Sequence, residues 1–172
     1  MGYSQKSDDF VKKALKLDGL TEDAMKARPK YKYYHKYLYK AEGVKMDNWA
    51  FDKVNPTTIW TRLGLDRMSA TQRETSAAFK TYVRYARKYD DKVYGYGYKA
   101  YNPSTDAEMD ALLRVWAKAD KPKLYVLKRL GMYDTYYSKT DSRKVVKEKI
   151  KNHPNFGKFQ TFMNYSPRHF GV

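Results

Sequence analysis

The sequence predicts an all-α fold, in which tandem small helical bundles are joined by helices or short linkers. Apolar and aromatic residues recur three or four positions apart, which is the spacing of one helix face. No segment sustains the alternation of apolar and polar residues that marks a half-buried strand. A set of apolar positions also recurs at fixed offsets, which indicates that one helical unit is repeated.

Helix start signals place the individual elements. Ser69 and Thr105 are each followed three residues later by Gln or Glu, the pattern of a capping box. Thr21 precedes two acidic residues, which is typical of a helix start. Pro56 and Pro122 also indicate helix starts, because proline in the first turn needs no amide partner. We expect helices near residues 7–17, 21–41, 46–53, 56–64, 70–92, 105–119, 122–131, 139–151 and 154–165.

Two tryptophans, Trp49 and Trp116, anchor the internal repeat. Each is followed by an apolar run that ends in Leu-Gly-Leu or Leu-Gly-Met. Gly64 or Gly131 in that run can adopt the left-handed conformation that ends a helix. The matched apolar positions are Ile59, Leu63 and Leu65 after the first tryptophan, and Val126, Leu130 and Met132 after the second.

An aromatic ladder follows in the second half of each unit, with one ring every three residues. This spacing keeps the rings near one helix face, so we expect them to belong to the core. Each tryptophan should pack on the ladder of its own unit, because a Trp–Tyr pair combines a large apolar area with a polar edge. The rungs are Tyr31, Tyr34 and Tyr37; then Phe79, Tyr82 and Tyr85; and finally Phe156, Phe159, Phe162 and Tyr165.

These patterns predict four segments along the chain. Residues 1–45 form a partial N-terminal unit without the tryptophan, and residues 46–93 form the first full unit. Residues 94–104 are rich in tyrosine and glycine and form a linker. Residues 105–172 form the second full unit, which carries an insertion before its aromatic ladder.

The composition limits the classes of function. The chain has 172 residues, no cysteine and a formal net charge of +16. The missing cysteines exclude disulfides, thiolate chemistry and cysteine-bound zinc. No apolar run is long enough to span a membrane. The positive charge either attracts anionic partners or only keeps the protein soluble. The even spread of the lysines along the chain favours the second interpretation.

These residues resemble the WY domain of oomycete RXLR effectors. That domain has a tryptophan, an apolar run ending in Leu-Gly-Leu, and a later helix that bears a tyrosine. The resemblance rests on the segment from Trp49 to Leu65, on Trp116 with Leu130 to Met132, and on the three ladders. It covers nearly the whole chain. The Arg-x-Leu-Arg motif and the secretion signal, which precede the effector domain in that family, do not occur in this sequence.

The resemblance implies a virulence effector that a pathogen secretes and that acts inside the host plant cell, in the cytoplasm, the nucleus or both. Members of the family mostly bind host proteins and suppress immunity. The tryptophan and tyrosine positions then serve as scaffold, while surfaces and loops carry the function.

The sequence offers no catalytic or cofactor motif, and we expect neither an enzyme nor a cofactor. His35, His153 and His169 lack metal-ligand spacing to one another or to a carboxylate. The acidic pairs, such as Asp8-Asp9 and Asp90-Asp91, are typical of charges at helix ends.

Two surfaces are candidates for binding a partner. The basic stretch from Arg143 to Lys151 could bind phosphate or act as a nuclear signal, although a helix face in water is the favoured interpretation. In that helix, Val145, Val146 and Ile150 could turn inward. Exposed tyrosines are common interface anchors, although those of the linker could instead pack between units. A host plant protein is the expected partner; nucleic acid bound by charge and stacking is the alternative, and a homodimer stays open. The linker tyrosines are Tyr94, Tyr96, Tyr98 and Tyr101.

Overall fold

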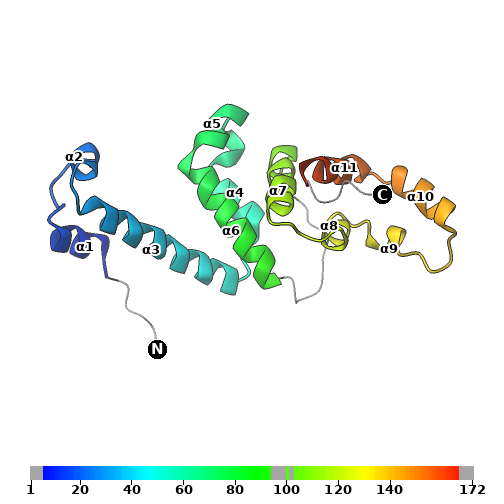
Figure 1. Ribbon diagram of the computed structural model, residues 1–172, viewed down its shortest axis with the longest axis horizontal. Coiled ribbons are helices and arrows are strands. Elements are labelled where there is room, and N and C mark those ends of the chain that lie inside the picture. The colour runs from blue at the N-terminus through cyan, green and yellow to red at the C-terminus, as the bar shows by residue number, and fades with distance from the viewer. Residues whose placement is uncertain (1–5, 94–99, 101–102, 167–172) are drawn as a thin grey trace. The chain divides into compact units, whose positions relative to one another are not determined.

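The computed structural model describes residues 6–93, residue 100 and residues 103–166, and these residues are helical with no strand among them (Figure 1). The predicted all-α class is confirmed. The helices are α1 (Asp8–Leu15), α2 (Glu22–Lys26), α3 (Tyr31–Phe51), α4 (Pro56–Arg62), the 3-10 helix η1 (Leu65–Arg67), α5 (Ala70–Thr75), α6 (Ala77–Val93), α7 (Asp106–Lys118), α8 (Lys123–Arg129), α9 (Tyr133–Tyr136), α10 (Arg143–Lys151) and α11 (Phe156–Tyr165).

The chain divides into two compact units, Met1–Asp52 and Lys53–Val172. The second unit has one buried core, to which helices from both 46–93 and 105–172 contribute. The boundaries drawn from the repeat, at 1–45, 46–93, 94–104 and 105–172, therefore remain predictions about how the sequence is organised.

In the first unit, α1 packs against α3 through its aromatic ladder. Tyr34 is buried, and its hydroxyl donates to Oδ1 of Asp8 at 2.7 Å. The Tyr37 hydroxyl donates to the carbonyl of Lys6, also at 2.7 Å. Hydrogen bonds from Lys12 and then Tyr34 lower the pKa of Asp8. The ladder of residues 31–37 thus turns one face of α3 toward α1.

Helix ends follow the predicted start and stop signals at several positions. Ser69 and Gln72 form the capping box, with bonds of 3.3 and 3.0 Å between each side chain and the other residue's amide. Pro56 opens α4. Gly64 and Gly131 have φ angles of 67° and 69°, so both take the left-handed conformation expected of them. At both positions, a residue with a Cβ atom would be strained.

The predicted helix ranges 21–41 and 46–53 are wrong. The range 21–41 breaks between α2 and α3, where the Tyr31 amide bonds the Arg28 carbonyl across Pro29. Helix α3 then continues without interruption through Gly43 to Phe51, so 46–53 is no separate helix. The single glycine does not stop the helix, because glycine in a helix interior costs only about 1 kcal/mol relative to alanine.

The predicted helix 70–92 divides at Ser76. The backbone of Ser76 is extended, and its Oγ accepts from the Phe79 amide at 3.0 Å, which caps the start of α6. The range 139–151 begins late for a similar reason, since Ser142 caps α10 and the helix starts at Arg143. A serine inside a helical pattern can cap a new helix, as both serines do here, and Ser76 also ends the preceding helix.

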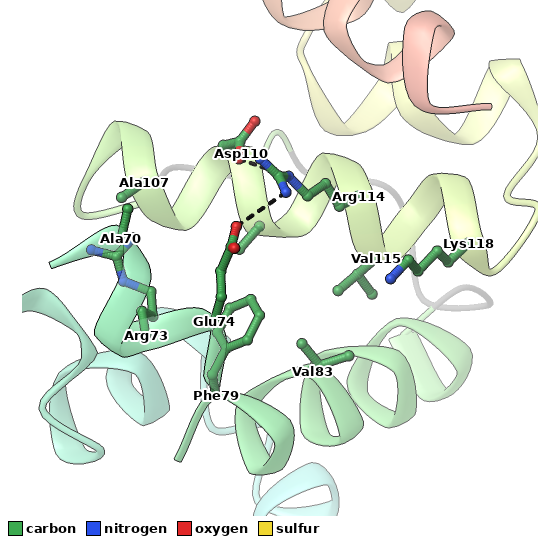
Figure 2. A pocket seen from close by; sticks show the side chains of 11 residues that line it. Ala70, Arg73, Glu74, Phe79, Val83, Ala107, Asp110, Arg114, Val115 and Lys118 are labelled. Atoms are coloured by element: carbon green, nitrogen blue, oxygen red, sulfur yellow. Dashed lines mark hydrogen bonds and ion pairs between the residues drawn. The ribbon is translucent and has the colours of Figure 1, made fainter. Parts of the chain in front are cut away.

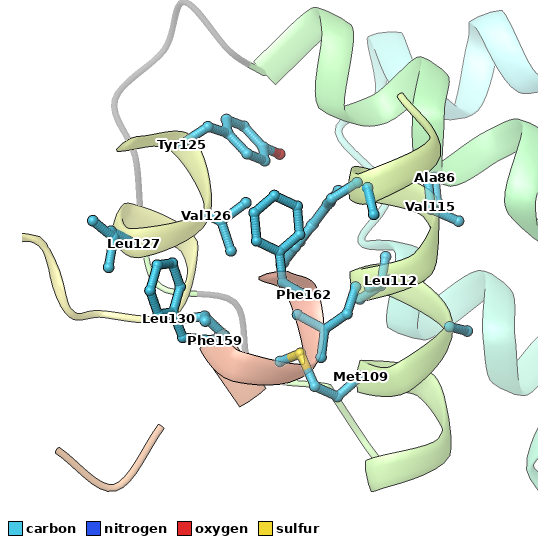
Figure 3. Close-up of a cluster of buried hydrophobic side chains, with 14 of the residues drawn as sticks. Ala86, Met109, Leu112, Val115, Tyr125, Val126, Leu127, Leu130, Phe159 and Phe162 are labelled. Carbon is cyan, nitrogen blue, oxygen red and sulfur yellow. The ribbon is translucent and has the colours of Figure 1, made fainter. Parts of the chain in front are cut away.

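The core of the second unit centres on α7, which packs against α6 on one side and α11 on the other (Figure 3). Phe159 and Phe162 of α11 enter the space beside Leu112 and Val126. The predicted core positions Leu63, Phe79 and Phe156 are partly buried. The predicted positions that are buried are Ile59, Leu65, Tyr82, Tyr85, Trp116, Val126, Leu130, Met132, Phe159 and Phe162.

Trp60, which the repeat did not predict as a core residue, packs on the ladder of residues 79–85. Its ring meets Tyr82 edge-on with centroids 4.9 Å apart, and Phe79 at 6.4 Å. Trp60 is fully buried, whereas Trp49 is partly buried in the first unit with Lys45 4.9 Å over its ring. The repeat pattern missed Trp60 because the matching position, Leu127, is aliphatic, although it is equally buried.

We predict that Trp60→Ala lowers the free energy of unfolding by about 3–5 kcal/mol, the cost of deleting a large buried aromatic side chain. Trp60→Phe should cost clearly less, because the indole Nε1 is buried with no hydrogen-bond partner among the described residues. Urea denaturation followed by circular dichroism measures both. Trp49→Ala serves as the comparison, and an equal loss in Trp49→Ala would contradict this assignment.

Candidate functional site

The predicted partner-binding tyrosines Tyr94, Tyr96, Tyr98 and Tyr101 lie outside the described residues, as does His169. The described part of the chain contains no group of three or more potential metal ligands. Nor does any helix in that part have the length and apolar character needed to cross a membrane. Binding surfaces among the described residues are therefore the remaining candidates.

A buried carboxylate, Asp90, joins three helices of the second unit. The Trp116 indole Nε1 of α7 donates to one of its oxygens at 2.6 Å, and the Tyr125 hydroxyl of α8 donates to the other at 2.6 Å. The buried guanidinium of Arg129 lies 3.9 Å away. Burial raises the pKa of Asp90, although these partners act in the opposite direction. Burial also raises the pKa of Tyr125, and nearby Asp90 adds to that effect.

Asp90 was predicted only to be a charge at a helix end, and its burial near the end of α6 was not expected. The prediction fits its neighbour Asp91, which is exposed and pairs with Lys121 at 2.6 Å. Asp90 instead points inward, because a residue one position away on a helix faces a direction about 100° different. Its role is to hold α6, α7 and α8 together.

A second buried carboxylate, Glu108, likewise joins helices, at the start of α7. It accepts from the Thr57 and Tyr82 hydroxyls, each at 3.1 Å, and from the amide and hydroxyl of Ser104 at 2.9 and 3.0 Å. The backbone amide of Glu108 donates to Oγ1 of Thr105, so the predicted cap at Thr105 is present. The Glu108 side chain thereby joins α4 and α6 to α7, and the two carboxylates fix α6 against α7.

A groove lies where α5, α6 and α7 meet (Figure 2). Its volume is about 490 Å³, within the range of about 300–1,000 Å³ that is usual for binding pockets. Its floor is apolar and comes from α6 and α7. The lining consists of Ala70, Arg73, Glu74, Phe79, Val83, Ala107, Asp110, Ala111, Arg114, Val115 and Lys118.

An ion-pair network crosses the groove from α5 to α7. Arg114 pairs with Asp110 at 3.0 Å and with Glu74 at 3.3 Å (Figure 2). Tyr165 of α11 supports the network, since its ring lies 5.0 Å from the Arg114 guanidinium and its hydroxyl donates to Asp110. Exposed pairs of this kind contribute only about 0–1 kcal/mol, so a partner can displace them at little cost.

The two other cationic side chains that line the groove, Arg73 and Lys118, differ in how firmly other residues hold them. Arg73 is held in place, because it donates to the carbonyls of Leu65 and Met68 at 3.1 and 2.8 Å and lies 5.1 Å over the Trp60 ring. Lys118 is exposed at the other end of the groove, and no described carboxylate pairs with it. The groove thus offers an apolar floor and one available positive charge.

The predicted basic stretch forms α10, and its charges are partly neutralised. Lys149 pairs with Asp141 at 2.7 Å, and Lys151 lies 3.7 Å from Glu148. Ile150 packs against the core, as expected. The inward orientation predicted for Val145 is wrong, since Val145 is 42% exposed.

The remaining histidines have ordinary environments. His35 is exposed on α3. His153 is partly buried, and its Nδ1 accepts from the Asn155 amide at 3.1 Å in a turn before α11. The sequence contains a usable signal for the ion-pair network, because Asp110 and Arg114 are four residues apart on one helix. It gave none for Glu74, which reaches Arg114 only through the tertiary fold.

Fold and surface together define an all-helical scaffold with two buried, hydrogen-bonded carboxylates and a groove on its outside. Relatives of the chain are known among pathogen proteins. A "Secreted RxLR effector protein" of Phytophthora infestans (strain T30-4) is 32% identical over 132 residues, which cover 73% of this chain and 58% of that protein. The "RxLR effector protein Avr1" of the same organism is 33% identical over 79 residues, covering 46% of this chain and 35% of that protein.

The chain belongs to the oomycete RxLR effectors. It spans little more than half the length of the first of these relatives and about a third of the second. No protein-family model matches the chain, and no solved structure matches it.

We predict that Asp90→Ala destabilises the second unit by about 3 kcal/mol or more. The substitution leaves the buried Trp116 and Tyr125 donors unpaired and removes the carboxylate beside buried Arg129. Asp90→Asn should cost less, since its amide can still accept one of these hydrogen bonds. Chemical denaturation of both variants, with the exposed Asp91→Ala as control, checks this. A loss in Asp91→Ala as large as in Asp90→Ala would contradict it.

Proposed function

We propose that this protein is a secreted virulence effector that binds a host plant protein inside the plant cell and suppresses immunity. The observation that supports this most strongly is its relationship to secreted RxLR effectors over most of its length. The WY-type interpretation of the helical bundles is part of the proposal. In it, the tryptophans and the aromatic ladders serve as scaffold and the outer surface makes the contacts.

The proposed contact surface is the groove between α5, α6 and α7. An amphipathic helix of the host protein would place apolar side chains on Phe79 and Val83, because such grooves bind helices through spaced apolar anchors. An acidic residue of that helix would meet Lys118, whose charge is available at the groove's end. The weak Arg114–Glu74 pair would open or re-form around the partner.

A pair of substitutions tests the groove without touching the core. Ala70→Trp places a large ring in the groove from an exposed position, and Lys118→Glu reverses the free charge. Each should weaken binding of the host protein about tenfold or more, since hot-spot contacts dominate interfaces. The control is Lys80→Glu, which makes the same charge change at an exposed site outside the groove.

The measurement uses photo-crosslinking in plant tissue that produces the protein. A photoreactive side chain at position 70 should capture one host protein that the same side chain at position 80 does not. Leaves producing the wild-type protein should show a reduced burst of reactive oxygen after an immune elicitor. Ala70→Trp and Lys118→Glu should restore the burst, and Lys80→Glu should not. A burst that stays suppressed in both groove variants would contradict the proposed surface, and an unreduced burst with the wild-type protein would contradict the function.

A further inference from the structure

One face of α3 in the first unit carries a row of exposed basic and aromatic side chains. With 3.6 residues per turn, these residues fall on the arc of the helix opposite buried Tyr34. Tyr33 and Tyr39 are 56% and 57% exposed. The face consists of Lys32, Tyr33, His35, Lys36, Tyr39 and Lys40.

The ladder rungs of α3 are separate from this face. Tyr34 and Tyr37 turn toward α1 and make hydrogen bonds to Asp8 and Lys6. The packing of α1 on α3 therefore does not use the Tyr33 ring, which lies beside a lysine instead. Lys32 Nζ is 5.1 Å from the centroid of that ring.

The lysines of this face are available for an anionic partner. No carboxylate in the described part of the chain forms an ion pair with Lys32, Lys36 or Lys40, and the face itself contains no acidic residue. The basic helix α10 differs in part, since two of its cations, Lys149 and Lys151, each have a carboxylate within 4.0 Å. This face of α3 therefore carries a row of three lysines without an ion-pair partner among the described residues.

We propose that this face of α3 is a binding site for single-stranded nucleic acid. The three lysines are four residues apart, so they rise about 6 Å from one to the next and form a row along the helix axis. A phosphate backbone could follow that row. Tyr33 and Tyr39 would stack on bases, which is how sequence-tolerant single-strand binders combine a cationic track with aromatic rings.

Other anionic partners fit this face less well. A protein interface is depleted in lysine relative to the rest of the surface, whereas this face has three. A membrane-bound helix needs a broad apolar face, and Leu38, the exposed aliphatic residue in these turns, lies away from the row. A duplex keeps its base faces stacked inside the helix, so the tyrosine rings would contact only its backbone.

The test measures binding of the full chain to a fluorescent single-stranded RNA of about 12 nucleotides, within the range of about 4–16 nucleotides that small single-strand modules occupy. We expect binding that is tighter than to a duplex of the same sequence, to polyglutamate or to phosphatidylserine vesicles. Tyr33→Ala should weaken it at least about fivefold, and Tyr33→Phe should retain it, because stacking needs the ring and not the hydroxyl.

Matched charge reversals distinguish binding at a specific site from a general effect of the protein's net positive charge. Lys36→Glu with Lys40→Glu should abolish binding, whereas Lys144→Glu with Lys147→Glu on α10, which makes the same change in net charge, should leave it nearly intact. Equal losses in the two double variants, no effect of Tyr33→Ala, or preference for duplex, polyglutamate or vesicles would overturn the proposal. The result is independent of the groove, because Ala70→Trp and Lys118→Glu should bind the RNA like the wild type.

Discussion

A carboxylate buried between three helices is the constraint on which the second unit depends. Asp90 can remain inside only because the Trp116 indole and the Tyr125 hydroxyl both donate to it and the guanidinium of Arg129 lies close by. Each of these partners comes from α7 or α8, so α6 cannot shift or rotate against them without leaving a buried polar group unpaired. Apolar packing alone tolerates many arrangements, whereas this network specifies one.

Glu108 supplies the matching constraint near the other end of α6 and α7, through Thr57, Tyr82 and Ser104. With both ends fixed, the α6–α7 pair presents a defined strip of small and apolar side chains beside α5, and that strip is the floor of the groove. The buried carboxylates lie outside this strip, so the contacts that fix α6 against α7 are distinct from the proposed binding surface. Such a scaffold leaves its outer residues free to vary without loss of the fold, which suits a family whose members are proposed to bind different host proteins.

The sequence predicted what depends on local signals. The caps at Ser69 and Thr105, the left-handed glycines Gly64 and Gly131, and the helical class follow from short-range physics, and the structure has them. It did not predict the break at Ser76, because the same serine can sit inside a helix or cap a new one. Trp60 was missed because only one copy of the repeat has an aromatic residue there. Asp90 and the groove depend on contacts between helices far apart in the chain, for which a single sequence gives no signal. The linker tyrosines, Tyr94 to Tyr101, remain a prediction.

In the proposed division of roles, the interior of the second unit holds the scaffold and the groove between α5, α6 and α7 binds the host partner. Hydrogen-exchange mass spectrometry can test this division of roles. The experiment compares the full chain alone with the full chain bound to the purified host protein that photo-crosslinking identifies. We expect added protection in peptides covering Ala70–Thr75 and the groove-facing turns of α6 and α7, with α10 and α3 unchanged. Added protection confined to α10 or to the first unit, with none around the groove, would contradict it.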